Sequence, residues 1–277
     1  MTSLSGSDAK TGEAAQRLID RWARFFGRAL IFDFNGTLSN DEPLILRIYA
    51  EMFRERLGWA LTPEDYYGRL AGRSDREIID TVLRDIGGDV RLGAQLLAER
   101  RTRYESMVQR HSPILSSTVR AVARLAASGV PLGIVTGAQR ADVELVLSRS
   151  PLAGLFQVVV TEEDVLNGKP DPEGFRLAAR MIGCDPAATL VFEDSLPGVR
   201  AAKAAGMLCI AVLGGGGGGD VRDVRDVGDV GDGGDVGDGG DGGTLTSGQI
   251  IAEADATVPS IAPELFGSLR TSGTGTA

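Results

Sequence analysis

Short apolar runs that alternate with helix-length segments are the feature of this sequence that most constrains its fold. The first run, residues 29–33, is apolar until it ends in Asp33, which is typical of a strand buried on both faces of a sheet. Alternating strand and helix patterns predict an α/β fold in which helices cover both faces of a Rossmann-like parallel sheet, a three-layer core. The other expected strands are residues 130–136, 158–161, 189–194 and 208–213, and the expected helices between them are residues 116–128, 138–149, 172–183 and 196–205.

Two further segments flank or interrupt this alternation. Residues 9–26 repeat apolar side chains every three or four positions, which predicts an amphipathic helix before the first strand. Residues 41–113 lie between the first two strands, although a crossover between parallel strands needs far fewer residues. Helical patterns fill this insertion at residues 44–57, 75–86 and 92–110. The expected organisation is therefore an N-terminal helix (1–28), an α/β core (29–40 and 114–270) and an inserted helical cap (41–113).

Residues 214–243 form a segment of low complexity, six glycines followed by Asp at every third position. So few apolar groups cannot offset the entropy of ordering, so we expect a disordered insertion within the core, with weak calcium association as an alternative. Globular sequence then resumes with an expected strand at residues 254–258 and a closing helix at residues 261–269. Residues 271–277 are expected to form a flexible tail.

Composition and charge exclude several classes of protein. The formal net charge is −9, but the repeat holds eight Asp and two Arg, so the rest of the chain is only mildly acidic. A nucleic-acid partner would require a basic face with interleaved aromatic residues, and the sequence has none. No apolar run approaches the roughly 18 residues of a membrane span, and Cys184 and Cys209 lack the spacing of a metal site. We expect a cytoplasmic protein, monomeric or dimeric, with packed thiols and no membrane or nucleic-acid partner.

The first motif that indicates a catalytic site is residues 33–38, DFNGTL, at the end of the first expected strand. A carboxylate at the end of a strand, followed by Gly and Thr, can attack an electrophile while nearby backbone amides hold anionic oxygens. The alternative is a simple turn in which Asp33 bonds its own backbone. Three more polar pairs or triplets follow other expected strands or loops, namely Thr136–Gly137, Lys169–Pro170 and Glu193–Asp194–Ser195.

These four motifs, in this order, resemble those of the haloacid dehalogenase superfamily, in particular its small-cap members related to phosphoglycolate phosphatase and β-phosphoglucomutase. The resemblance covers about residues 29–213 and implies a phosphatase. It assigns Asp33 as the nucleophile that forms an aspartyl-phosphate, and Lys169 as the cation that neutralises it. It also implies that Thr136 and the Gly137 amide bind the phosphoryl oxygens.

The resemblance further implies a Mg²⁺ cofactor, which prefers oxygen ligands and takes one or two carboxylates. Its ligands would be Asp33, the backbone carbonyl of Asn35 and Asp194, with Glu193 in support. Each motif also has a plainer interpretation. Thr136 could close its own turn, Lys169 could be a solvated loop residue, and one of the two carboxylates, or Ser195, could cap the following helix.

Asn35 departs from the family pattern, in which a second aspartate protonates the leaving group and then activates water. An amide cannot exchange a proton near neutral pH, although general acid–base help is worth about 10² to 10⁴-fold in rate. The sequence therefore leaves two function classes, a hydrolase of a small phosphorylated metabolite and an impaired protein that only binds or regulates. Either the enzyme borrows an acid such as Asp41 or Asp75, or its substrate needs little protonation. Asn35→Asp is expected to raise turnover if asparagine is the only defect.

The cap is expected to set substrate specificity. Residues 72–76, GRSDR, resemble a substrate-facing cap loop in which Arg73 and Arg76 could bind the phosphate or carboxylate of a small anionic metabolite. The plainer interpretation is a helix start, with Ser74 as N-cap and Glu77 completing a capping box. Residues 41–113 contain no lysine, which disfavours an imine-forming phosphonate hydrolase. Asn35 disfavours a mutase, and the Glu193–Asp194 pair disfavours a metal-free dehalogenase.

Overall fold

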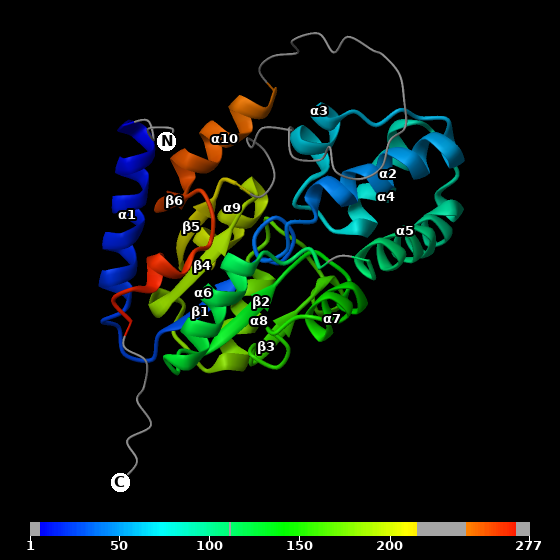
Figure 1. The fold of residues 1–277 in the computed structure, drawn as a ribbon. Helices are drawn as coiled ribbons and strands as arrows, with labels where there is room; N and C mark the ends of the chain where they lie inside the picture. Colours follow the sequence, from blue (N-terminus) through cyan, green and yellow to red (C-terminus); the bar gives the residue numbers. More distant parts are fainter. Residues whose placement is uncertain (1–5, 111, 215–241, 270–277) are drawn as a thin grey trace.

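A computed structural model of the protein describes residues 6–110, 112–214 and 242–269. The described residues form a central parallel sheet with helices on both faces, and a group of helices gathers beyond one end of the sheet (Figure 1). This confirms the expected α/β fold with a helical insertion. No helix within the described ranges has both the length and the apolar character needed to cross a membrane.

The sheet has six parallel strands in the order β3-β2-β1-β4-β5-β6. Its register is continuous across the centre, where Leu30 of β1 pairs with Leu132 on one side and with Leu190 on the other. The expected strands are confirmed, each one to three residues shorter than its apolar run. Their bounds are β1 (Ala29–Phe32), β2 (Leu132–Val135), β3 (Val158–Val160), β4 (Thr189–Glu193), β5 (Leu208–Val212) and β6 (Ala256–Val258).

Alternation along β1 divides the core into two layers. Leu30 and Phe32 belong to one apolar cluster, whereas Ile31 belongs to another on the opposite face. Side chains of successive strand residues point to opposite faces, so a central strand must be apolar throughout to be covered on both. The Phe32 and Phe192 rings stack with centroids 5.6 Å apart, which locks the two central strands together.

The core helices cover both faces of this sheet. The first cluster includes Trp22 and Leu125, from the N-terminal helix and from the helix before β2, whereas Phe175 and Val199 belong to the second. Trp22 also donates its indole N–H to the Ala188 carbonyl, 2.9 Å away, which ties the N-terminal helix to the core. These helices are α1 (Gly6–Trp22), α6 (Ser116–Ala127), α7 (Arg140–Ser148), α8 (Glu173–Ile182), α9 (Leu196–Ala204) and α10 (Gly242–Glu253).

The insertion between β1 and β2 is helical, as expected. Its buried side chains include Tyr49, Phe53 and Tyr104, so the helices pack on one another as well as on the core. The sequence did not reveal the short turns between the first two long helices. The elements are α2 (Glu42–Leu57), α3 (Pro63–Asp65), the π-helix η1 (Tyr66–Leu70), α4 (Asp75–Asp85), the 3₁₀ helix η2 (Val90–Leu92) and α5 (Gly93–Val108). The exact limits of the cap, 41–113, stay a prediction.

Two expectations for the C-terminal part need correction. The closing helix at residues 261–269 is only the 3₁₀ helix η6 (Pro263–Phe266), because Ile261, Phe266 and Leu269 turn into the core instead of following a helical stripe. The expected disordered segment 214–243 overlaps α10, whose first residues are Gly242 and Gly243. Residues 215–241 of that segment, and the tail at 271–277, lie outside the described residues.

Two further 3₁₀ turns flank strands of the sheet. The turn η3 (Glu162–Asp164) follows β3, and η4 (Pro186–Ala188) precedes β4 at the opposite edge. Because all strands are parallel, their carboxyl ends share one edge. The strand order places β1 between β2 and β4, so the chain crosses over in opposite directions on either side of β1. Ligands of open α/β sheets bind at such a switch point.

Candidate active site

Three of the residues singled out in the sequence follow the three adjacent central strands. Asp33 follows β1, Thr136 follows β2, and Asp194 follows β4. The Asp33 amide donates to the Phe192 carbonyl at 2.9 Å, so the backbone of the expected nucleophile is still held by the sheet. Asp33 and Thr136 are 6% exposed, so both side chains are held inside the protein. This edge of the sheet therefore brings together the first, second and fourth motifs.

Lys169 brings the third motif into the same cluster. Its ammonium group forms an ion pair with Asp33 and a second one, at 2.5 Å, with the Glu193 carboxylate. The lysine side chain is only 8% exposed, and its ammonium also lies 5.5 Å from the centre of the Phe175 ring. A solvated loop lysine would not be desolvated in this way, so the plainer interpretation of Lys169 is wrong.

Glu193 uses both of its carboxylate oxygens inside the protein. One accepts from Lys169, and the other accepts from the backbone amide and the hydroxyl of Ser195, at 2.7 and 2.9 Å. The Ser195 hydroxyl in turn accepts from the Gly198 amide and caps α9. The plainer interpretation of Ser195 as a helix cap is therefore confirmed. Glu193 has no free oxygen, which suits a supporting role better than direct metal binding.

Asp194 faces the turn that follows β1. A Cβ atom added to Gly36 would lie 1.9 Å from an Asp194 oxygen, and Gly36 has φ +76°, so only glycine fits at this position. The Thr37 hydroxyl donates to the other Asp194 oxygen at 3.3 Å. The sequence Asn35–Gly36–Thr37 thus wraps closely around the second carboxylate, which brings the first and fourth motifs together.

Thr136 and Gly137 stand at the tip of β2, below the cap. The Thr136 hydroxyl oxygen accepts from the Ala138 amide at 3.0 Å, so the expected closing of its own turn is present. This contact uses the oxygen and leaves the hydroxyl hydrogen to donate elsewhere. A Cβ on Gly137 would meet backbone atoms of Arg73 and Ser74 at 3.3 to 3.4 Å, so the cap loop packs directly over the strand tip.

The cap loop closes over the core at Gly72. A Cβ there would lie 2.6 Å from the Cβ of Ser195, and φ is +80°, so the close approach requires glycine. Ser74 caps α4 and forms a complete capping box with Glu77, which confirms the plainer interpretation of these two residues. The side chains of Arg73 in this loop and of Arg76 in the first turn of α4 are exposed and line the cavities described next.

Two connected cavities lie between the cap and the core. The smaller, about 30 Å³, is walled by Asp33, Asn35 and Asp194 from the core and by Arg73 and Arg100 from the cap. The larger, about 370 Å³, is lined by Lys169, Arg76 and the loop after β3. Both cavities include Gly72, Thr136 and Gly137 in their walls. The larger space has the volume of a small-molecule site, but the expected nucleophile faces the smaller one.

The buried carboxylates give this edge a surplus of negative charge. Burial raises the pKa of Asp33 to about 7, with Lys169 opposing and Glu193 adding to the increase. Burial, together with Glu193 and Asp33, raises the pKa of Asp194 well above its usual range. Although burial disfavours its charge, Asp33 and Glu193 raise the pKa of Lys169. One ammonium group therefore serves three carboxylates, and a second cation would relieve their repulsion.

A Mg²⁺ ion fits the donor set better than a softer metal. Within the described residues, no three His, Cys, Asp or Glu side chains converge to form a metal site on their own. Mg²⁺ does not require such a cage, because it binds one or two carboxylates and keeps several waters. Asp33, Asp194 and the Asn35 carbonyl supply oxygen ligands only. The neighbouring residue is Gly36, and a Cβ atom at that position would lie 1.9 Å from an Asp194 oxygen. The residues present thus suit the ion that the resemblance implies.

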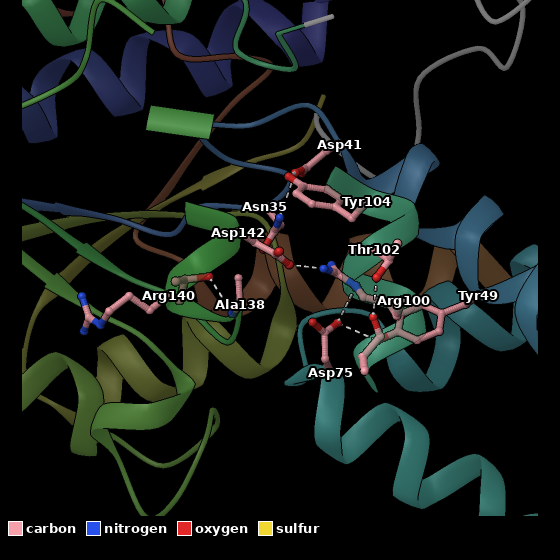
Figure 2. A network of polar contacts seen from close by, with 12 residues as sticks. Asn35, Asp41, Tyr49, Asp75, Arg100, Thr102, Tyr104, Ala138, Arg140 and Asp142 are labelled. Carbon is pink, nitrogen blue, oxygen red and sulfur yellow. Dashed lines mark hydrogen bonds and ion pairs between the residues drawn. The ribbon is translucent and has the colours of Figure 1, made fainter. Parts of the chain in front are cut away.

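Reasoning from sequence missed a buried polar network that runs from the site into the cap, and Figure 2 shows most of it. Arg100 of α5 forms ion pairs with Asp75, at 3.2 Å, and with Asp142 of α7. Tyr49 donates to Asp75 at 2.5 Å, and Tyr104 donates to Asp41. Tyr49, Arg100, Tyr104 and Asp142 lie inside helices, and Asp41 and Asp75 lie at the starts of α2 and α4. Nothing local distinguishes an inward polar side chain from an outward one at these positions.

Glu42 is the other missed residue. It follows the turn after β1, is 7% exposed, and lines the smaller cavity together with Asp33. The Tyr66 hydroxyl donates to its carboxylate at 2.7 Å. Burial raises the pKa of Glu42 to about 7, with the Tyr66 hydrogen bond opposing and Asp41 adding to the increase. Of the two acids considered from sequence, Asp75 lines this cavity but is tied to Arg100, and Asp41 is tied to Asn35.

Comparisons with known proteins agree with this geometry. The family model of haloacid dehalogenase-like hydrolases matches residues 30–212. Validoxylamine A 7'-phosphate phosphatase of Streptomyces hygroscopicus subsp. limoneus is 31% identical, over 67% of this chain and 85% of the relative. The phosphorylated carbohydrates phosphatase of Thermotoga maritima is 30% identical, over 65% of this chain and 82% of the relative. The crystal structure of CbbY from Rhodobacter sphaeroides in complex with phosphate superposes with a TM-score of 0.61 at 28% identity, covering 68% and 86% of the two chains.

Proposed function

The chain belongs to the haloacid dehalogenase-like hydrolases, and we propose that it is a Mg²⁺-dependent phosphatase that acts on a small phosphorylated metabolite through Asp33. The contact that carries this proposal is the buried ion pair between Asp33 and Lys169, next to Asp194 at the same sheet edge. The substrates in the names of two relatives, validoxylamine A 7'-phosphate and phosphorylated carbohydrates, support a sugar-like phosphate ester as the substrate class.

The first chemical step uses Asp33 as the nucleophile. One carboxylate oxygen attacks phosphorus in line with the ester oxygen, so that an aspartyl-phosphate forms as the ester bond breaks. Lys169 stays next to this carboxylate and offsets the negative charge of the approaching phosphoryl group. Thr136 and the Gly137 amide, at the tip of the neighbouring strand, donate hydrogen bonds to the phosphoryl oxygens. Asp33, Thr136 and Gly137 are held at the ends of strands and Lys169 by its two ion pairs, so these groups are in place before substrate arrives, which lowers the cost of reorganisation.

Mg²⁺, when bound by Asp33, Asp194 and the Asn35 carbonyl, supplies a Lewis acid that neutralises charge on the transferring phosphoryl group. Glu193 contributes indirectly, because it fixes Lys169 on one side and the start of α9 on the other. The Gly36 turn places its backbone against Asp194, which keeps the oxygen ligands close together.

In the second step, the oxygen of a water molecule bonds to phosphorus, the bond between phosphorus and the Asp33 oxygen breaks, inorganic phosphate leaves, and the proton of the water passes to solvent. Asn35 cannot take a proton from this water, nor give one to the departing alcohol in the first step. Turnover then depends on how easily the leaving group departs, so esters with acidic alcohols should react fastest. Glu42 is a carboxyl group of the same cavity that can hold a proton near neutral pH.

The cap controls access to these groups. The small cavity over Asp33 has about 30 Å³, which accommodates a water molecule but not a phosphate ester. The contact of Gly72 with Ser195 therefore corresponds to a closed cap, and substrate entry requires the loop to move away. Arg73 and Arg76 are carried on this loop and would contact the phosphorylated substrate when it closes.

The direct test is hydrolysis of an aryl phosphate, whose leaving group needs little protonation. We expect the purified protein to hydrolyse it with Mg²⁺, to lose activity with a chelator, and to regain it when Mg²⁺ is added back. Asp33→Asn should reduce turnover by on the order of 10⁴-fold or more, because the nucleophile acts as a unit with its partners. Asp80→Asn, an exposed change on α4 that lines neither cavity, serves as the matched control. Circular dichroism checks that both variants fold.

The asparagine at position 35 is also compatible with a second function, that of a protein that binds phosphorylated ligands without useful turnover. The hydrogen bond that Asn35 donates to Asp41 supports it, because position 35 is then a neutral amide that cannot transfer a proton to substrate. Equal inertness of the wild type and Asp33→Asn toward a wide panel of phosphate esters, with retained phosphate binding in the wild type, would favour this alternative over the phosphatase.

A further inference from the structure

Asn35 and Asp41 form a single amide–carboxylate pair at the edge of the cavity that holds Asp33. We propose that Asp41 is a positioning residue that fixes the orientation of the Asn35 side chain. The pair accommodates a single carboxylate, which stands at position 41 and not at position 35. This deepens the proposed function, because position 35 is where the related phosphatases are expected to carry the acid. It also reverses the expectation that Asn35→Asp alone repairs the site.

The hydrogen bond defines how the Asn35 amide is turned. Its nitrogen donates to an Asp41 oxygen at 3.0 Å, and the same oxygen accepts from the Tyr104 hydroxyl (Figure 2). A carboxylate can only accept, so it selects the NH₂ end of the amide and directs the carbonyl oxygen away. Asp41 and Tyr104 are fully buried, and burial in a low-dielectric site strengthens such contacts.

Asp41 forms this hydrogen bond instead of capping its own helix. It occupies the N-cap position of α2, where an aspartate side chain normally accepts from the first free amides of a helix. Here its side chain makes no cap bond and is turned instead toward Asn35 and Tyr104. The carboxylate is therefore committed to the site and the cap helix α5, rather than to its own helix.

The orientation gives Asn35 a specific chemical role. With one N–H donated to Asp41, the amide turns its carbonyl oxygen away from that carboxylate, and this oxygen is the acceptor that Asn35 can offer in the cavity that it lines with Asp33. Such an acceptor can orient a hydrogen-bond donor, either the water that attacks the aspartyl-phosphate or a hydroxyl of the substrate, without exchanging a proton. An amide plays this part in other phosphoryl-transfer enzymes, where a glutamine orients the attacking water.

Replacing Asn35 by aspartate would set a half-buried carboxylate against the buried carboxylate of Asp41, in place of a 3.0 Å hydrogen bond. Like charges at this separation cannot both ionise without a large penalty, so the two groups would share a proton or move apart. Either outcome disturbs the turn that also carries the Asn35 carbonyl and Gly36. The single change should therefore harm the site, whereas the exchange Asn35→Asp with Asp41→Asn keeps one carboxylate and one amide.

The experiment is a double-mutant cycle of Asn35→Asp, Asp41→Asn and the double variant, measured in two ways. Turnover is measured with Mg²⁺ on an aryl phosphate and on an alkyl phosphate such as glycerol phosphate. We expect Asn35→Asp to lose about tenfold or more on both esters. The double variant should regain aryl turnover and exceed the wild type on the alkyl ester by about 10²-fold, because an acid now stands at position 35. A purely structural pair would not produce this difference between leaving groups.

Thermal unfolding is the second measurement, and it does not depend on activity. Asn35→Asp should lower Tm by several degrees, and adding Asp41→Asn should restore most of the loss. Gln16→Glu is the matched control, because Gln16 donates to Asp20 at 2.9 Å in the same amide–carboxylate arrangement on the outer part of α1. Solvent screens that pair, so the control should change Tm little and turnover not at all.

Three results would overturn the proposal. They are a gain of alkyl-phosphate turnover from Asn35→Asp alone, additive effects of the two changes on Tm, and a double variant that does no better than Asn35→Asp. A wild type that hydrolyses neither ester contradicts the proposed phosphatase but not the pair, which the Tm cycle still decides. If Asn35→Asp fails to fold, recovery of folding in the double variant supports the pair, and continued failure contradicts it.

Discussion

The core side and the cap side of the cleft each hold buried charges, but the two are balanced differently. On the core side, Lys169 is shared by Asp33 and Glu193, and Asp194 has no cationic partner of its own. On the cap side, Arg100 lies between Asp75 and Asp142, and Tyr49 and Tyr104 add neutral donors around it. With all carboxylates ionised, the core cluster of Lys169, Asp33, Glu193 and Asp194 has two surplus negative charges, whereas Arg100 with Asp75 and Asp142 has one.

This difference in charge balance suits the core cluster to catalysis and the Arg100 network to holding the cap in place. A cluster with surplus negative charge attracts a divalent cation and an electrophile, which is what a carboxylate nucleophile requires. The Arg100 network instead spans α5, the start of α4 and α7 of the core, so it holds the cap against the sheet domain (Figure 2). Burial raises the pKa of Asp142 to about 6, with Arg100 opposing the increase, so the core end of this bridge remains ionised at neutral pH.

Removing the lysine of the core cluster should have the largest effect. Lys169→Met leaves Asp33 and Glu193 buried without their cation, and breaking such a buried pair typically costs about 3 to 5 kcal/mol of unfolding free energy. Turnover of an aryl phosphate should also fall by on the order of 10³-fold, since the charge that offsets the phosphoryl group is lost. Denaturant unfolding and steady-state kinetics measure the two effects.

Lys203→Met is the matched control for that change. Lys203 pairs with Asp255 at 2.6 Å, but its side chain is 37% exposed. An exposed pair contributes about 1 kcal/mol or less. Similar losses in the two variants would contradict the view that the Lys169 cluster is desolvated and catalytic.

Glu42 allows a pH test of the core side. Its pKa of about 7 in the folded protein exceeds the ordinary value of 4.5, so between these values the folded state holds a proton that the unfolded chain has lost. This stabilisation is complete below about pH 4.5 and disappears as pH rises through about 7, a loss of about 3 kcal/mol. Glu42→Gln keeps a neutral side chain at all pH values, so its stability relative to wild type should rise from about pH 5 to about pH 8.

The measurement is denaturant unfolding of both proteins with a chelator present at each pH. Asp33 and Asp194 also have raised pKa values in both proteins and lose stability in the same direction. The Glu42 charge contributes to the raised pKa of Asp194, so the difference between the two proteins reports Glu42 together with its repulsion of Asp194. A difference between wild type and Glu42→Gln that stays constant with pH would show that Glu42 is ionised throughout, and that it does not hold the proton assigned to it.

Weakening the cap network should have the smallest effect. Asp142→Asn removes the core end of the bridge but leaves Arg100 paired with Asp75, so we expect a loss of about 1 to 2 kcal/mol, in the range of one hydrogen bond to a charged group. Aryl-phosphate kcat should change less than KM, because the cap closes less firmly while Asp33 and Lys169 stay in place. Asp85→Asn, which breaks the exposed pair with Arg69, is the control. A larger loss in kcat than in KM would place Asp142 in the chemistry instead.

Much of the core could be predicted because its signals are local. Strands β1, β2 and β4 are mainly apolar and are followed by, or end in, polar residues, and parallel strands bring those ends to one edge. The helices of the core and cap follow from their periodicity, with errors mainly at their ends. The closing helix failed because three apolar residues near the C-terminus, Ile261, Phe266 and Leu269, fit a helical stripe as well as they fit an irregular segment that folds onto the core.

The sequence by itself determined the parallel sheet and the strand-end cluster of Asp33, Thr136 and Asp194, since short-range patterning and chain connectivity are enough to specify them. Only the tertiary structure decided how Asn35 is turned, where Asp41 points, and that Arg100 is buried against Asp142. The physical reason is that an inward-facing charge on a helix is stable only when an opposite charge from a distant segment meets it. Such a meeting depends on how the cap docks on the sheet, and no local pattern records it.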